Sequence, residues 1–248
     1  MEGTAFWTVA ILAAALVGLS KGGLPVVAML SVPLLALVMP PVAAAGLLLP
    51  VYVVSDAFGL YAYRHAFDRR VLAILAPAAT IGIALGWATA ALVPERGVTG
   101  LIGLIGAVFA ARLLLRRGPP RPAKRAAVAP GAFWGILTGF TSFVSHAGAP
   151  PYQVYVLPLR LEKAVFAGTS TVLFAYVNAV KLIPYWALGT LTPADLGIAA
   201  VLMVPAAAAV FVGVRLVRIL PERRFFQLVT WALLAVSLRL LWVALAGA

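Results

Sequence analysis

The chain has 248 residues, of which 64% are hydrophobic and only 10% are charged. A soluble domain carries about 25% charged residues, so this composition excludes a soluble domain and predicts an integral membrane protein. The net charge of +12 does not indicate nucleic-acid binding, because the basic residues lie between apolar blocks, where the positive-inside rule places them. The absence of cysteine excludes disulfide bonds and thiolate ligands.

Ten apolar blocks follow one another and predict an all-α polytopic membrane protein. The blocks span about residues 5–20, 24–39, 41–63, 71–93, 98–115, 131–144, 149–159, 164–188, 194–214 and 225–246. The first, second, sixth and seventh blocks are too short to cross a hydrocarbon core of ~30 Å as straight helices. We therefore expect six full spans and two helical hairpins or broken helices, which makes about 8–10 membrane segments.

A short polar sequence, Ser20, Lys21, Gly22 and Gly23, separates the first two blocks. Glycine lets the backbone approach a ligand closely, and a helix that begins near Pro25 would direct free N–H groups at the break. Lys21 adds a positive charge. These four residues are the first candidate substrate-binding site for an anion; the alternative is an ordinary turn whose lysine reaches the bilayer surface.

Asp56 is the only acidic residue deep inside an apolar block. An intramembrane carboxylate indicates a functional role, because its burial is costly. Asp56 could carry a coupling proton, or it could form a permanent ion pair with Lys21 or Lys181. The second half has the neutral Asn178 at the equivalent position, so only the first half would titrate.

The basic, proline-rich segment 116–130 divides the chain into an N-terminal membrane repeat (1–115) and a C-terminal membrane repeat (131–248). A second break, Ser145, His146, Ala147 and Gly148, opens the C-terminal repeat and is a second candidate part of the substrate site. His146 could bind the anion or could be a structural residue. The paired breaks predict that the two meet near the bilayer midplane and bind one anion.

Similar residues of the two halves recur at two fixed distances along the sequence, which supports an internal repeat. At a separation of 125 residues the pairs are Lys21 with His146, Pro25 with Pro150 and Pro33 with Pro158, and at 122 they are Gly46 with Gly168, Asp56 with Asn178 and Tyr63 with Tyr185. Thr169 and Ser170 follow Gly168 and could line the substrate path. Hydroxyls in membrane helices also commonly bond to their own helix.

Fifteen of the 19 Lys and Arg residues lie in four regions on one side of the expected topology: 64–70, 112–125, 160–163 and 215–224. This side is predicted to be cytoplasmic, which places the linker inside the cell and both termini in the periplasm. The two halves then have opposite, inverted topologies.

Signatures of enzymes are missing from the sequence. It has no phosphate-binding G-x-x-x-x-G-K-[ST] motif, and its two histidines lie in separate halves without nearby carboxylates. We therefore expect no enzymatic activity, no cofactor and no metal site.

The breaks, the later prolines and the stretch Ala167-Gly168-Thr169-Ser170 resemble the TauE/SafE (TSUP) family of membrane transporters over nearly the whole chain. The resemblance implies a secondary transporter, proton-coupled, that moves sulfite, a sulfonate or a related small organosulfur anion across the cell inner membrane. An anion channel and a membrane scaffold or assembly subunit are the alternatives.

The predicted topology can be tested directly because the chain has no cysteine. An Arg121→Cys variant should react with a membrane-impermeant thiol reagent only from the cytoplasmic side, since the basic linker is held there by the positive-inside bias. Labelling in intact and in opened cells measures this, and labelling from the periplasmic side alone would show that the orientation is reversed.

Overall fold

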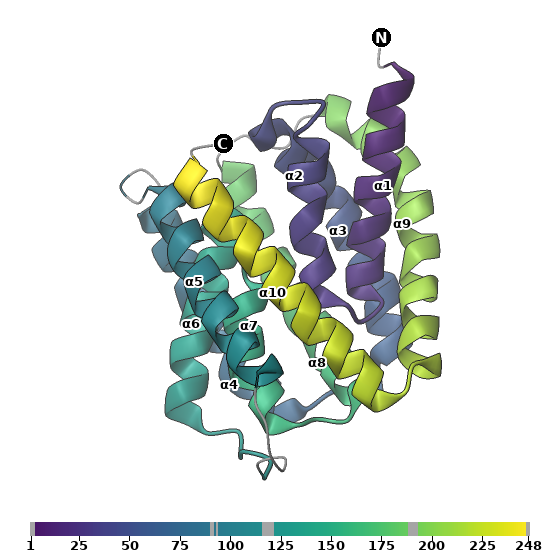
Figure 1. Cartoon of the computed structure of the whole chain (residues 1–248). Coiled ribbons are helices and arrows are strands. Elements are labelled where there is room, and N and C mark those ends of the chain that lie inside the picture. Colours follow the sequence, from purple (N-terminus) through teal and green to yellow (C-terminus); the bar gives the residue numbers. More distant parts are fainter. Residues whose placement is uncertain (1–2, 90–91, 93, 116–121, 188–192, 247–248) are drawn as a thin grey trace. The chain divides into compact units, whose positions relative to one another are not determined.

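The computed structural model describes residues 3–89, 92, 94–115, 122–187 and 193–246, and the regular elements in these ranges are all helical (Figure 1). The first half contains α1 (Thr4–Lys21), the 3₁₀ helix η1 (Pro25–Leu30), α2 (Ser31–Leu35), α3 (Pro41–Tyr63), α4 (Arg69–Ala88) and α5 (Glu95–Leu114). The second half contains α6 (Val128–Ser145), α7 (Ala149–Val156), the 3₁₀ helix η2 (Leu157–Leu159), α8 (Lys163–Ala187), α9 (Pro193–Ile219) and α10 (Glu222–Ala246). Eight helices in the described ranges are long and apolar enough to cross a membrane. The predicted all-α polytopic class with 8–10 segments is confirmed.

The two halves run through the same order of elements: a long helix, a short helical segment and three long helices. The third and fourth of these elements contain an internal proline in both halves: Pro50 in α3 and Pro77 in α4, Pro184 in α8 and Pro205 in α9. Membrane helices tolerate such prolines because neighbouring groups and local backbone adjustments satisfy the freed carbonyls. The shared order supports the predicted repeat, whose inverted orientation stays a prediction.

Each half opens with a helical hairpin. Helix α1 packs against η1 and α2, and α6 packs against α7, so the chain folds back on itself after each break. The structure corrects one detail, because α1 and α6 have 18 residues each and are long enough to be counted among the eight candidate spans. Helix α1 continues through Ser20 and Lys21, and α6 begins three residues before the apolar block. Pro25 begins a 3₁₀ helix in place of the expected α-helix.

One compact unit comprises residues 1–67 and 164–220, and therefore contains α1–α3, α8 and α9. Helix α9 packs against α1 and α3. Its contact with α1 is close because small residues face each other, as is usual between membrane helices. Gly18 lies against the backbone of Ala206, and Gly22 lies against Gly213. A Cβ atom at either glycine would overlap with the backbone of α9.

The other compact unit comprises residues 68–163 and 221–248, and therefore contains α4–α7 and α10. Helix α4 packs against α6, with Gly139 on the backbone of Ala79, and α5 packs against α10. The described end of the linker is attached to this unit, since the Lys124 N–H donates to the Pro158 carbonyl at 3.0 Å. Each unit thus combines helices of both sequence halves, and the boundaries 1–115 and 131–248 stay a prediction about the repeats.

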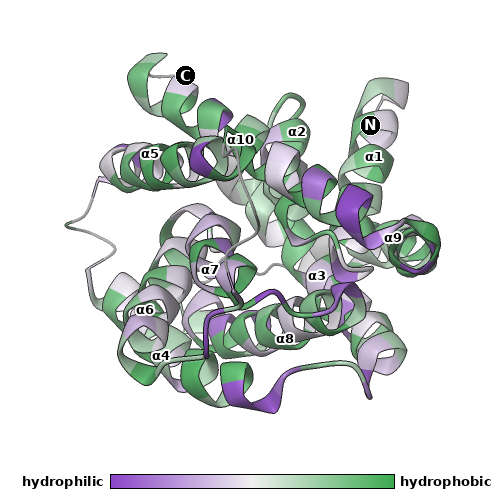
Figure 2. Cartoon of the chain, turned by 60° about the horizontal axis from the view of Figure 1, so that its bottom comes forward, coloured by the Kyte–Doolittle hydropathy of each residue, from purple (hydrophilic) through white to green (hydrophobic). Residues whose placement is uncertain are grey.

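Corresponding helices make corresponding contacts inside the two units. In one unit, α1, the first element of the first half, packs against α9, the fourth element of the second half. In the other unit, α6, the first element of the second half, packs against α4, the fourth element of the first half. Figure 2 shows that hydrophobic residues dominate the long helices, while hydrophilic residues gather mainly near helix ends and in connecting segments. This distribution is the one expected when a bilayer surrounds the helices.

We predict that Gly18→Ala destabilises the protein by about 1–3 kcal/mol, because the added methyl group must push α1 away from α9. The matched control is Gly197→Ala in α9, where a Cβ atom meets no other atom within 4 Å. Unfolding in detergent measures both changes. Equal stability of the two variants would contradict the close α1–α9 contact.

Candidate functional site

The first break is a tight reversal that requires glycine. Helix α1 ends at Lys21, and the N–H of Gly22 donates to the Gly18 carbonyl at 2.9 Å. Gly23 has a φ of +114°, a conformation that residues with a side chain rarely adopt. A Cβ atom there would also collide with the Tyr63 hydroxyl. The two glycines therefore let the chain turn between α1 and η1 against α3.

Two side chains cap the end of α1. The Tyr63 hydroxyl of α3 donates to the Gly22 carbonyl at 2.7 Å, and the Thr171 hydroxyl of α8 donates to the Lys21 carbonyl at 3.1 Å. The last carbonyls of a helix have no partner within it, so these bonds satisfy groups whose burial would otherwise be costly. The break is thus held by both neighbouring helices.

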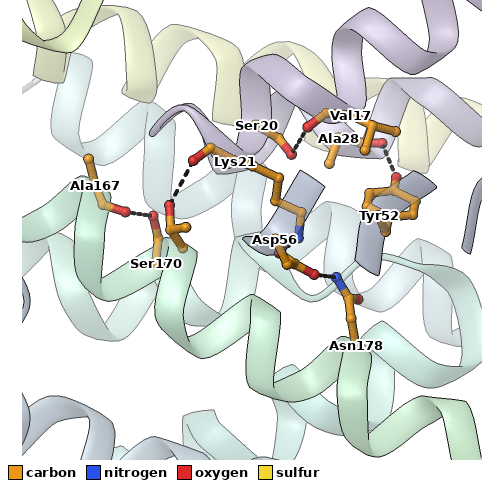
Figure 3. A network of polar contacts seen from close by, with 10 residues as sticks. Val17, Ser20, Lys21, Ala28, Tyr52, Asp56, Ala167, Ser170 and Asn178 are labelled. Carbon is orange, nitrogen blue, oxygen red and sulfur yellow. Dashed lines mark hydrogen bonds and ion pairs between the residues drawn. The ribbon is translucent and has the colours of Figure 1, made fainter. Parts of the chain in front are cut away.

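A buried ion pair lies directly beside the break. The Lys21 Nζ atom is 2.7 Å from Asp56 Oδ1, and the exposed fractions of the two side chains are only 4% and 6%. Asn178 of α8 donates to the other carboxylate oxygen, Oδ2, at 2.8 Å. Figure 3 shows Lys21 and Asn178 reaching Asp56 from different helices. The carboxylate therefore joins α1, α3 and α8.

Tyr52 connects this ion pair to the returning arm of the hairpin. Its ring lies 5.3 Å from Lys21 Nζ, within the range of a cation–π contact. Its hydroxyl shares a hydrogen bond of 2.6 Å with Ser31 and donates to the Ala28 carbonyl at 3.0 Å. Both partners belong to the η1–α2 arm, so the arm is fixed against α3 next to the charges.

Lys181 adds a second buried cation to the same region. Its side chain is 1% exposed, and its ammonium lies 5.5 Å from the centre of the Tyr185 ring. It follows Asn178 by three residues on α8, a spacing that places both side chains on one helix face. Because Asn178 binds Asp56, this spacing places Lys181 near the ion pair. The region thus brings two lysines together with one carboxylate.

The remaining predicted residues of this unit use their hydroxyls locally. Ser20 donates to Val17, Thr169 to Val165 and Ser170 to Ala167, in each case to a carbonyl of their own helix. Gly168 lies so close to the carbonyl of Ala66 that a side chain there would clash. The small-residue stretch therefore allows α8 to approach the turn after α3, and its role in substrate binding stays a prediction.

The second break belongs to the other compact unit. Helix α6 ends at Ser145, His146 adopts a left-handed conformation with a φ of 52°, and α7 begins at Ala149. The Ala147 N–H donates to the Thr141 carbonyl at 3.1 Å, and the Thr141 hydroxyl donates back to the Ala147 carbonyl at 3.1 Å. The predicted break at Ser145–Gly148 is thus a real end of a helix. Its meeting with the first break stays a prediction.

Sequence reasoning missed some of the residues that build the site. Thr171 directly follows the predicted residues Thr169 and Ser170, but nothing in the sequence indicated that it caps α1. Tyr63 was noted only as a repeat match to Tyr185. Among the residues that the structure describes, no three or more His, Asp or Glu side chains come together to hold a metal ion.

Buried charges inside apolar helices, beside a glycine-rich break, are features of membrane transport proteins. The family model described as Sulfite exporter TauE/SafE matches residues 10–240, nearly the whole chain. The chain therefore belongs to the TauE/SafE family, which consists of transporters and not enzymes. No curated protein and no solved structure was found to match it.

We predict that Lys21→Met destabilises the protein by about 3–5 kcal/mol, because it leaves a buried carboxylate without its cation. The double variant with Asp56→Leu should lose much less than the sum of the two single variants. Unfolding in detergent measures this cycle, with the exposed Lys124→Met as control. Additive losses would contradict a direct coupling between Lys21 and Asp56.

Proposed function

We propose that the chain is a proton-coupled secondary transporter that moves sulfite, a sulfonate or a related small organosulfur anion across the cell inner membrane. Family membership supports transport of a small anion by a multi-pass membrane protein. The observation that carries the finer proposal is the set of buried charges in one compact unit, namely Lys21, Lys181 and Asp56. In the proposed orientation both termini are periplasmic.

The net charge of these three side chains favours the binding of an anion. With both lysines protonated and Asp56 ionised, the region carries one excess positive charge. An uncompensated charge is costly among apolar helices, and a bound monoanion would neutralise it. Lys181 is a candidate for direct contact with the anion, because it is a buried cation one helical turn from Asn178.

The same arrangement suggests how a proton could be coupled to the anion. A proton that binds to Asp56 removes the negative charge opposite Lys21. The net positive charge of the region then increases, so the proton and the anion favour each other's binding. Asn178 can keep its hydrogen bond to Asp56 in both states, because its amide can donate to a carboxylate or a carboxyl oxygen. Coupling of this kind needs no movement of the helix backbone at the moment of protonation.

We expect Lys181→Gln to reduce the uptake of sulfite into proteoliposomes by about tenfold or more, because a charged hydrogen-bond donor to the anion is lost. Lys124→Gln is the matched control, since it removes the same charge from an exposed position. Flux is measured with sulfite, sulfoacetate, taurine and a carboxylate. Equal flux in the two variants would exclude Lys181 from the site.

We expect Asp56→Asn to abolish net transport driven by a pH gradient while anion exchange survives, because the variant cannot bind and release the proton. The measurement compares pH-driven uptake with counterflow in the same proteoliposomes, and Asp68→Asn, at the cap of α4, is the control. Unchanged pH dependence would refute the coupling role. Electrogenic flux without counterflow would identify a channel, and absence of any flux in the unmodified, folded protein would favour a scaffold.

A further inference from the structure

A cleft of about 470 Å³ lies in one compact unit, at the ends of α3 and α9, outside the buried charges described above. Its walls combine cations with aromatic and aliphatic side chains and contain no acidic residue. The main lining residues are Tyr61, Arg64, Phe211, Arg215, Arg218 and Ile219. Helices α3 and α9 pack against each other and both end here, at Tyr63 and Ile219.

The cationic part of the cleft is partly preorganised. The Arg64 guanidinium stacks on the Tyr61 ring at 4.4 Å and donates to the Tyr61 carbonyl at 2.9 Å. Arg215 and Arg218 are three residues apart and therefore share one face of α9. A basic residue at a helix end is favoured by the helix dipole. That effect does not explain why three arginines surround one concave space without a carboxylate.

The apolar part of the cleft continues along the helices away from the arginines. Phe211 lies seven residues before Arg218, about 10 Å further along α9, and its ring packs edge to face on Phe58 of α3 at 6.0 Å. Large apolar side chains remain exposed here, with exposed fractions of 37% for Phe58 and 53% for Phe211. The cleft therefore has a cationic end and an apolar end, so it fits an amphipathic anion better than a small hydrophilic one.

We propose that this cleft binds an anionic phospholipid, with the phosphate at Arg64, Arg215 and Arg218 and an acyl chain along Phe58 and Phe211. Basic residues at the level of the headgroups attract anionic lipids, and aromatic residues are enriched at the same level. The complementary charge and the apolar wall select this occupant. A lipid here would bridge the ends of α3 and α9.

The bound lipid would also stabilise the conformation of the first break. Tyr63, next to Arg64, donates to the Gly22 carbonyl, and Val217, next to Arg218, lies against Gly23. A lipid that holds the ends of both helices therefore supports the two side chains that pack on the glycines. Its binding should raise the stability of the folded state in proportion to its affinity.

The test uses the full-length protein, freed of lipid in a neutral detergent and titrated with phosphatidylglycerol or phosphatidylcholine. Phosphatidylglycerol should raise the unfolding temperature far more than phosphatidylcholine. Arg215→Gln combined with Arg218→Gln should weaken the phosphatidylglycerol affinity by about thirtyfold, since each arginine near an anionic lipid contributes about fivefold. Arg223→Gln combined with Arg224→Gln is the matched control at exposed positions of α10 and should change the affinity little.

Equal weakening in the two double variants would show a diffuse charge effect and overturn the proposal. Inorganic phosphate or sulfite alone, if it stabilised the protein as well as the lipid does, would identify a small-anion site and also overturn it. A photoactivatable phosphatidylglycerol on the unmodified protein gives a measurement that does not depend on variant folding. Cross-links within 58–64 and 211–219 support the site, and cross-links that avoid these segments refute it.

Discussion

The fold around the first break depends on one interaction, the buried ion pair between Lys21 and Asp56. Moving two charges out of water costs several kcal/mol per ion, on the order of what one good pair recovers, so the pair is retained only with further hydrogen bonds. Asn178 supplies one to the carboxylate, and the Tyr52 ring faces the ammonium. These contacts come from α3 and α8, and they fix where α1 must end. The glycines of the break and the caps from Tyr63 and Thr171 follow from that position.

The contact between Asp56 and Asn178 bears on the origin of the architecture. The two residues are 122 positions apart, the separation that also relates Tyr63 to Tyr185. Equivalent positions of two repeats touch each other only close to the axis that relates the repeats. The hydrogen bond of 2.8 Å between them is therefore consistent with α3 and α8 being equivalent helices of an internal repeat. The order of elements in the two halves leads to the same proposal independently.

The sequence predicted the helices well and the side-chain partners poorly, for a physical reason. Apolar blocks are local features, and α3, predicted over 41–63, forms over Pro41–Tyr63. The burial of Asp56 was also predictable, because a carboxylate in an apolar block must find a partner. Its choice between Lys21 and Lys181 depends on how α1, α3 and α8 pack, and pattern alone does not contain that information. The polar residues Ser20 and Lys21 similarly looked like the end of a block, yet the helix continues through both because their polar groups find partners there.

The difference between Asp56 and Asn178 determines the net charge of the proposed site. An aspartate at 178 would place a second carboxylate within hydrogen-bonding distance of Asp56. If both were ionised, the two carboxylates would cancel the charges of Lys21 and Lys181, and no excess positive charge would remain for an anion. Asparagine keeps the hydrogen bond and adds no second negative charge. The neutral amide at 178 thus leaves the proposed site with a single carboxylate among its three buried charges, as proton coupling at one group requires.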